Sequence, residues 1–341
     1  MNARDAQRHR ARVASLRAHG PAYMRARREL RRIHEGGGQN PTLYLVRRTF
    51  ILARTPEPSA PVVASPAAAL APMRGWALHL YLIALFETQA QHRAGFAVTN
   101  TRPLLNGSKL QAAWVDLLPA VTSTTPRSAG MRRQLVRALA LLEQQNLVGL
   151  RGRAGFRGRY DYFRLRLENG GRIQGRESAY TVPLPSDVGT VDPAWIRPPG
   201  PAQGRSAVIS LPASFFLNGW VHVLSAAEIT TYLMLRDLEA RYPVAGQAGV
   251  YANNPQRETW YGIHRDIYAT HRQLTAYGLV DRLDAPARNP DGTIAPGGGK
   301  QMLQPYWFRT TPEGFDQVAL PTLVDRLDLP HAPQPTEGHA G

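Results

Sequence analysis

The sequence contains no cysteine, and this absence excludes disulfide bonds and metal sites built on thiolate ligands. Lysine is nearly absent as well: of the 41 basic residues only Lys109 and Lys300 are lysines, and all the others are arginines. No run approaches the roughly 18 consecutive apolar residues that a membrane-spanning helix requires. The basic residues 1–35 are not followed by the apolar segment of a secretory signal peptide. We therefore expect a cytoplasmic protein with no membrane segment.

Motifs that would indicate an enzyme, a metal centre or a nucleotide site are also missing. The histidines are scattered, with no HExxH motif and no pair at metal-ligand spacing. The GGGK sequence at 297–300 resembles part of a phosphate-binding loop, but Ile294 stands where that loop needs glycine and Gln301 where it needs Ser or Thr. The glycines at 152–158 do not fit the dinucleotide-binding pattern. We expect no catalytic residue, no metal, no cofactor and no small-molecule substrate.

Positive charge is the strongest compositional feature. The formal net charge is +16 at pH 7, and the planar guanidinium fork of arginine matches phosphate geometry. Such a chain favours phosphate-rich polymers or anionic membrane surfaces as partners. Residues 1–40 form a basic arm, which we expect to be solvated and partly disordered alone and to become ordered on a phosphate backbone.

Proline, glycine and serine divide the remainder of the chain into two predicted domains. After the basic arm we expect a strand and a Pro/Ala-rich linker at 41–72, a first domain at 73–170, a Gly/Pro-rich linker at 171–206, a second domain at 207–328 and a disordered tail at 329–341. A hydrophobic content of 43% is enough to build a core in each domain.

One pattern of apolar residues occurs in both predicted domains. Positions i, i+4 and i+7 are apolar or aromatic in each, which predicts a helix with one narrow buried stripe. The stripe consists of Leu135, Leu139 and Leu142 in the segment 131–150, and of Ile267, His271 and Leu274 in the segment 260–283. Because His271 lies on this stripe, we interpret it as a hydrogen-bonded core histidine rather than a ligand.

The elements around each stripe also follow the same order. Each stripe helix is preceded by a longer apolar helix, at 75–89 in the first domain and after the predicted capping box of Ser225 and Glu228 in the second. Each stripe ends at Asn146 or Gly278, residue types that tolerate the left-handed conformation. A Leu-Val pair then opens a strand that leads into a glycine-containing hairpin.

Helix, shorter helix, third helix, strand, glycine-tipped loop and strand is an order that resembles the winged-helix family of DNA-binding domains. The resemblance covers roughly 73–170 and 207–320. It implies a mainly α fold with small β-wings, an α+β class with two winged-helix domains in tandem. The tandem arrangement resembles plasmid replication initiators, which are dimeric as repressors and bind repeated origin sites as monomers. It also resembles two-domain transcriptional regulators. A homodimer is left open.

In the winged-helix family the third helix lies in the major groove and the wing contacts the flanking backbone or minor groove. Arginine can donate two parallel hydrogen bonds to guanine, which suits base recognition by the helices. The candidate residues of the third helices are Arg132, Arg133 and Arg137 in the first domain, and His264, Arg265, Tyr268 and Arg272 in the second. Val136 and Ala140 are small enough to allow close approach to thymine methyl groups.

The first wing is the most basic part of either predicted domain. Its arginines all fall in one nine-residue stretch of a glycine-rich hairpin. This density suits contact with phosphate better than base reading. They are Arg151, Arg153, Arg157 and Arg159. The second wing, with Arg288 and Lys300, is less basic, and we expect it to contribute less.

From these features we expect a non-enzymatic protein that binds specific sites in double-stranded DNA. A replication initiator or repressor of a plasmid or similar mobile element is the favoured function. Three alternatives stay open: a transcriptional regulator with two winged helices, a protein-interaction adaptor that uses the same domains, and a structural nucleic-acid binder without sequence preference.

Overall fold

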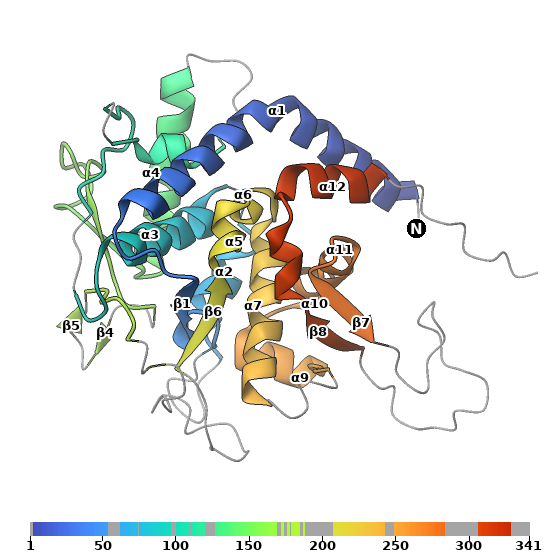
Figure 1. The fold of residues 1–341 in the computed structure, drawn as a ribbon. Coiled ribbons are helices and arrows are strands. Elements are labelled where there is room, and N and C mark those ends of the chain that lie inside the picture. Colours follow the sequence, from blue (N-terminus) through green and yellow to red (C-terminus); the bar gives the residue numbers. More distant parts are fainter. Residues whose placement is uncertain are drawn as a thin grey trace, which may run out of the picture.

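The computed structural model describes residues 3–53, 62–73, 75–96, 100–108, 111–119, 127–168, 172–173, 176–177, 179–184, 187, 207–242, 249–283 and 306–328. Over these residues the fold is mainly helical with small antiparallel sheets, each of two strands, which agrees with the α+β class indicated by the sequence (Figure 1). One continuous cluster of buried apolar side chains runs through it. Within the described residues, no helix combines the length and the apolar character needed to cross a membrane.

The N-terminal residues form one long helix, α1 (Ala3–Gly36), which crosses the top of the molecule in Figure 1 and packs beside α12 (Ala319–Asp328). This differs from the solvated, partly disordered arm that we expected. Its buried side chains are Val13, Leu16, Ala26, Leu30 and Ile33. Burying a leucine stabilises a fold by about 2 kcal/mol, so this apolar seam is sufficient to hold the helix on the protein.

Residues 75–168, here called the first segment, contain the long apolar helix, the stripe helix and the hairpin expected from the sequence, but a four-residue 3-10 turn stands where the second helix was expected. In chain order they are α3 (Ala77–Gln91), η2 (Trp114–Leu117), α4 (Arg127–Gln144), β2 (Val148–Leu150) and β3 (Phe163–Leu165). Val148 pairs with Leu165 in the antiparallel hairpin. Asn146 has a positive φ of 55°, which confirms the left-handed residue predicted at the end of the helix. The predicted stripe of Leu135, Leu139 and Leu142 is buried.

Residues 207–328, here called the second segment, repeat this order with more irregular helices. In chain order its elements are β6 (Val208–Pro212), α5 (Ala213–Leu217), α6 (Trp220–Val223), α7 (Ala226–Arg241), α9 (Asn254–Gln256), the π-helical turn η5 (Arg257–Tyr261), α10 (Arg265–Tyr268), α11 (His271–Ala276), β7 (Val280–Leu283), β8 (Trp307–Thr310), η6 (Pro312–Asp316) and α12. The capping box of Ser225 and Glu228 is confirmed at the start of α7. Gly278 has φ 71°, and Ile267, His271 and Leu274 are buried as predicted.

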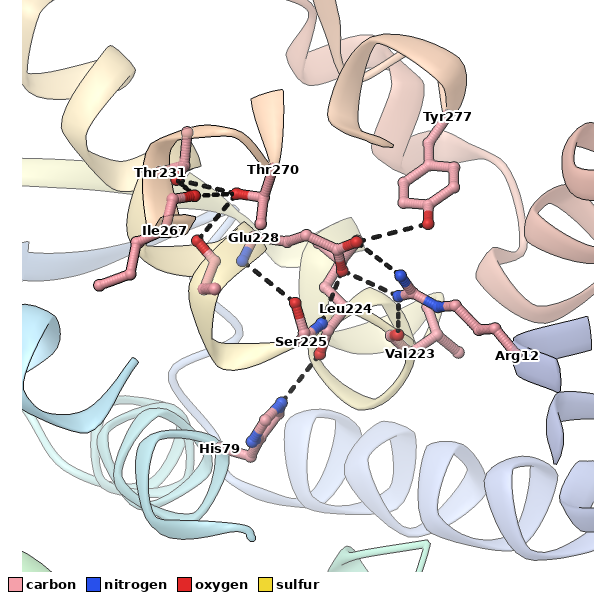
Figure 2. A network of polar contacts seen from close by, with 11 residues as sticks. Arg12, His79, Val223, Leu224, Ser225, Glu228, Thr231, Ile267, Thr270 and Tyr277 are labelled. Atoms are coloured by element: carbon pink, nitrogen blue, oxygen red, sulfur yellow. Dashed lines mark hydrogen bonds and ion pairs between the residues drawn. The ribbon is translucent and has the colours of Figure 1, made fainter. Parts of the chain in front are cut away.

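The stripe helix of the second segment is divided into α10 and α11, where we expected one continuous helix. Thr270 lies at the division, and its hydroxyl donates to the Ile267 carbonyl oxygen at 2.6 Å. The Thr270 hydroxyl also contacts the Thr231 hydroxyl. The Thr231 hydroxyl donates to the same carbonyl oxygen of Ile267 (Figure 2). Side-chain hydrogen bonds of this kind compete with the backbone bonds of a regular helix, which explains the break.

A two-stranded antiparallel sheet joins distant parts of the chain. Strand β1 (Leu43–Arg47) pairs with β6, with Leu43 opposite Pro212 and Arg47 opposite Val208. The chain continues through the short turn η1 (Arg48–Phe50). The strand expected in 41–72 is confirmed as β1. The Pro/Ala-rich linker expected after it includes a buried helix, α2 (Pro66–Leu70), and its residues 54–61 lie outside the described residues. The expected linker at 171–206 includes two short paired strands, β4 (Arg172–Ile173) and β5 (Arg176–Glu177), and the buried side chain of Tyr180, and its residues 188–206 also lie outside the description.

Polar contacts tie α1 to the second segment. Arg12 of α1 donates two hydrogen bonds, at 2.6 and 2.8 Å, to the carboxylate of Glu228, and a third to the carbonyl oxygen of Val223 (Figure 2). Glu228 also accepts from the backbone N–H of Ser225 at 2.7 Å. Burial alone would raise the pKa of Glu228, but the charge of Arg12 and these hydrogen bonds outweigh it and lower that pKa. The carboxylate is therefore ionised and serves both as helix cap and as counter-ion.

A second buried ion pair joins η1 to α7. Arg48 and Asp237 are both fully buried, with 2.5 Å between Nε and Oδ1. Asp237 also pairs with Arg241 at 2.7 Å and accepts a hydrogen bond from the Tyr261 hydroxyl at 2.7 Å. The acidic residues of α7 therefore neutralise arginines within the fold, as the alternation of charges along this helix suggests.

Candidate nucleic-acid interface

The helix α4 separates a buried side from a basic, exposed side. On a helix of 3.6 residues per turn, Arg133, Arg137 and Ala140 fall opposite the leucine stripe, and Arg132 falls on one flank. All four side chains are exposed, while Val136 is half-buried on the same flank as Arg132. Within the described residues, none of these three arginines forms an ion pair with an acidic side chain. The outer face of α4 therefore presents arginine side chains to solvent.

The loop between β2 and β3 presents a second group of arginines. Arg151, Arg153 and Arg157 are exposed. The loop turns tightly through glycines with positive φ: Gly152 (66°), Gly155 (85°) and Gly158 (82°). Successive turns are closed by backbone hydrogen bonds from Phe156 to Arg153 and from Arg159 to Phe156, both at 3.1 Å. The exposed guanidinium groups are thus carried on a loop with its own internal hydrogen bonds.

Arg159 differs from the other arginines of this loop. Its guanidinium donates to Glu143 of α4 at 2.6 Å and also to the carbonyl oxygen of Gly152. A guanidinium already paired with a carboxylate has less positive charge to offer a phosphate. The sequence assigns Arg159 to DNA contact; in the structure its guanidinium is engaged with the end of α4 and with the backbone of the loop.

A groove of about 650 Å³ runs along the β2–β3 hairpin. Its lining includes Arg151 and Arg164, together with Asn100, Thr101 and the exposed ring of Tyr162. Arg166 also lines this groove, and its guanidinium lies close to Gly149. The hairpin therefore has basic side chains along its groove as well as on its loop.

In the second segment, three of the four candidate residues are exposed, and the fourth, Tyr268, is half-buried. His264, Arg265 and Arg272 are exposed. Arg265 and Arg272 fall opposite the buried stripe by helical spacing, in positions equivalent to Arg133 and Ala140 of α4. His264 precedes α10 and its side chain makes no capping hydrogen bond.

Tyr268 departs from the expected arrangement because it is not on the outer face. It follows Ile267 directly and so falls on the flank of the stripe, the position that half-buried Val136 occupies in α4. The Arg257 guanidinium lies 4.8 Å from the centre of its ring, and the rings of His271 and Phe308 pack edge-on to it. Burial raises the pKa of Tyr268 to about 12. These contacts make Tyr268 part of the packing of the second segment.

His271 lies in an aromatic environment. Its ring contacts Tyr268, Tyr306 and Phe308, with 4.8 Å between the centres of the His271 and Phe308 rings. Burial, together with the charges of Arg272 and Arg282, lowers the pKa of His271 to about 4. The imidazole is therefore neutral at pH 7, as suits a residue of the core. The residues of the second wing, Arg288 and Lys300 among them, lie outside the described residues.

The sequence does not single out Arg25 and Arg28, two exposed arginines of the predicted basic arm that the fold brings to the first segment. Arg25 and Arg28 line a small groove together with Met131, the residue that precedes Arg132 in α4. The signal was present as the buried Ala26, Leu30 and Ile33, which leave Arg25 and Arg28 on the other side of the helix. What the sequence does not show is which element this side faces.

No protein-family model, no curated protein and no solved structure matches the chain. Among the residues that the structure describes, no group of three or more His, Asp or Glu side chains is placed to hold a metal ion. The arrangement of the exposed arginines is therefore the feature that bears on the function.

Proposed function

We propose that the protein binds double-stranded DNA at specific sequences through two winged-helix units in tandem. The observation that carries this proposal is the repetition described above. In the first segment α4, and in the second the pair α10–α11, bury a narrow stripe, end at a left-handed Asn146 or Gly278 and lead into an antiparallel strand pair. In both, the side opposite the stripe carries exposed arginines.

Two kinds of contact follow from this arrangement. The outer faces of α4 and of α10–α11 would enter the major groove, where Arg133 and Arg265 can each pair with a guanine. The loop arginines Arg151, Arg153 and Arg157 would contact phosphate groups, which adds affinity without sequence information. The net charge of +16 supports a binding free energy that depends strongly on salt.

The proposed biological role is the initiation of replication of a plasmid or similar mobile element, combined with repression at its promoter. This role requires recognition of several short sites by the same chain, and two DNA-reading units in one chain suit it. Selection of binding sites from the DNA that flanks the gene tests it. Repeated short sites support an initiator, whereas a single inverted repeat at the promoter indicates a transcriptional regulator instead.

DNA binding itself is tested by fluorescence anisotropy with labelled duplexes across a range of salt concentrations. We expect Arg133→Ala and Arg265→Ala to reduce the preference for the selected site over random duplex by about 5- to 150-fold, the worth of one arginine–guanine pair. Arg157→Ala should weaken binding to both duplexes alike. Arg326→Ala, which removes an exposed arginine of α12, is the control.

Two results would contradict this proposal. If the wild-type chain fails to bind random duplex even at low salt, the protein is not a DNA-binding protein, and an adaptor role becomes the better explanation. If all three substitutions weaken every duplex equally, the chain binds DNA without sequence preference, and the helices do not read bases.

A further inference from the structure

The outer face of the β2–β3 hairpin lines the groove of about 650 Å³ described above. Phe163 and Leu165 of β3 are buried. Because successive side chains of a strand point to opposite faces, Tyr162 and Arg164 both lie on the outer face. The Tyr162 side chain is 48% exposed, and Arg164 is exposed as well. The hairpin thus offers the groove an accessible aromatic ring and a guanidinium group two residues apart.

The β7–β8 hairpin of the second segment neutralises the equivalent arginine, whereas the β2–β3 hairpin does not. In each hairpin, the second paired residue after the left-handed end of the stripe lies opposite an arginine. In the second segment that residue is Asp281, whose carboxylate pairs with Arg309 at 3.1 Å. In the first segment it is Gly149, and within the described residues Arg164 forms no ion pair with an acidic side chain. None of the described residues that line the groove is acidic. The positive charge of Arg164 is therefore available to a ligand.

The aromatic residues of the two outer faces differ in the same way. Trp307, two residues before Arg309, is half-buried and packs against Tyr251 with 5.1 Å between ring centres. Tyr162, two residues before Arg164, has no ring contact with another aromatic side chain of the described part of the chain. One outer face is thus occupied by its own contacts, and the other presents a ring that can stack on a planar partner.

An open aromatic ring beside guanidinium groups suits an unpaired nucleobase and its phosphate. Every base has a π face, so stacking on an aromatic ring tolerates any base, while arginine binds the adjoining backbone. A duplex offers no such face, because its bases are stacked on one another inside the helix. Arg151 and Arg164 both line the groove, whose 650 Å³ lies within the roughly 300–1,000 Å³ of pockets that hold a drug-sized molecule. A nucleotide of a single strand therefore fits both the size and the chemistry of the groove.

We propose that this groove binds single-stranded nucleic acid, with a base stacked on Tyr162 and the phosphate beside it bound by Arg164. A strand separated from its complement is a different ligand from a duplex seated on α4. The site therefore goes beyond the proposed function and does not depend on it. In a replication initiator, such a groove would hold one strand after the duplex has opened.

The test uses the full chain and a fluorescent thymidine oligonucleotide of about 16 nucleotides, the upper end of ordinary single-strand site sizes, with anisotropy measured at low salt. Tyr162→Ala removes the ring and should weaken binding by about 5- to 150-fold, the usual effect of losing one stacked base. Tyr162→Phe keeps the ring and should bind like the wild type. The affinity for random duplex should be unchanged in both variants. A uridine oligonucleotide of the same length shows whether DNA or RNA binds more tightly, and binding of either supports the proposal.

Three arginine variants test the phosphate contact. Arg164→Ala should make the slope of log K against log salt concentration shallower by about 0.7, the contribution of one phosphate contact on a single strand. Arg164→Lys keeps the charge and should keep the slope. Arg309→Ala is the matched control, because it removes the equivalent arginine, which Asp281 already neutralises, and it should leave the slope unchanged. Thermal unfolding followed by circular dichroism checks that each variant is folded, which we expect because Tyr162, Arg164 and Arg309 are all exposed.

The outcomes separate the single-strand site from duplex binding. Wild-type affinity for the oligonucleotides in Tyr162→Ala would show that no base stacks on the ring and would overturn the site. An equal loss of single-strand and duplex binding in Tyr162→Ala, or an equal loss of slope in Arg309→Ala, would overturn it as well. If the wild type binds duplex but neither oligonucleotide, the groove has no such role and the proposed function stands. If it binds an oligonucleotide but no duplex, the proposed function fails and the single-strand site stands.

Discussion

His79 and His222 reach across the junction of the two segments in opposite directions. His79 of α3 donates from Nε2 to the carbonyl oxygen of Leu224 at 2.9 Å, and His222 of α6 donates from Nε2 to that of Leu117 at 2.9 Å. A carbonyl oxygen only accepts hydrogen bonds, so each imidazole carries its proton on Nε2. Both rings are buried, and burial lowers the pKa of His79 and lowers that of His222 to about 4.

This pair predicts a loss of stability in mild acid. Both histidines have a lower pKa in the folded than in the unfolded chain, so the unfolded state binds more protons below pH of about 6.5. Their contribution is complete above that pH and is lost as the pH falls through each folded-state pKa, which for His222 is about 4. For His222 the loss amounts to about 3 kcal/mol of unfolding free energy, since one pKa unit corresponds to about 1.4 kcal/mol.

Urea unfolding at pH 7 and at pH 4.5 measures this effect. His222→Gln is the matched variant, because its amide can donate to Leu117 but does not titrate. We expect a flatter dependence of stability on pH in His222→Gln than in the wild type. Parallel curves would show that His222 does not titrate in this range.

The second prediction concerns the ion pair of Arg12 and Glu228. Arg12→Ala leaves the Glu228 carboxylate buried without its counter-ion, and such losses cost about 3 to 5 kcal/mol of unfolding free energy. Arg10→Ala, on the exposed side of the same helix, should change stability by less than about 0.5 kcal/mol. Chemical denaturation measures both. A small effect of Arg12→Ala would mean that α1 is held by its apolar seam alone.

The third prediction separates positioning from contact at Arg159. If Arg159 only holds the loop against α4, Arg159→Ala and Glu143→Gln should weaken DNA binding to a similar extent, because both break the 2.6 Å pair. The slope of log K for DNA binding against log salt concentration should stay the same in Glu143→Gln and change little in Arg159→Ala. A slope that falls by about 1 in Arg159→Ala alone would assign it a phosphate contact instead.

The fourth prediction concerns Tyr268. Because its ring is packed under Arg257, Tyr268→Phe should keep both stability and base preference. Tyr268→Ala should lower the unfolding free energy by about 3 kcal/mol, the usual cost of removing a packed aromatic ring. Denaturation and anisotropy measure the two variants. A changed base preference in Tyr268→Phe would show that the hydroxyl reaches the DNA.

The features that could be predicted from the sequence are those that depend on neighbours along the chain. The stripe of Leu135, Leu139 and Leu142 follows from helical periodicity, and the capping box of Ser225 follows from the spacing of two residues. The left-handed Asn146 follows from the need to end a helix before a strand. Helical spacing also places Tyr268, which follows Ile267 directly, on the flank of its stripe and not on the outer face.

The features that could not be predicted depend on partners far along the chain. Nothing near Arg12 identifies Glu228, which lies 216 positions away, as its partner, and a helix rich in arginine resembles a solvated arm until that partner is known. The pairing of Arg159 with Glu143 and the division of a helix at Thr270 likewise result from tertiary contacts.

The pairing of β1 with β6 has a consequence for how the protein is made. Leu43 leaves the ribosome long before Pro212, its partner in the sheet. At about 5 to 20 residues per second, the nascent β1 waits roughly ten to thirty seconds with its backbone groups bonded to water and not to a partner strand. An unpaired strand attracts other strands, so this interval is when the growing chain is most exposed to aggregation. The protein should therefore depend on a holding chaperone during translation more than proteins whose strands pair with their nearest neighbours.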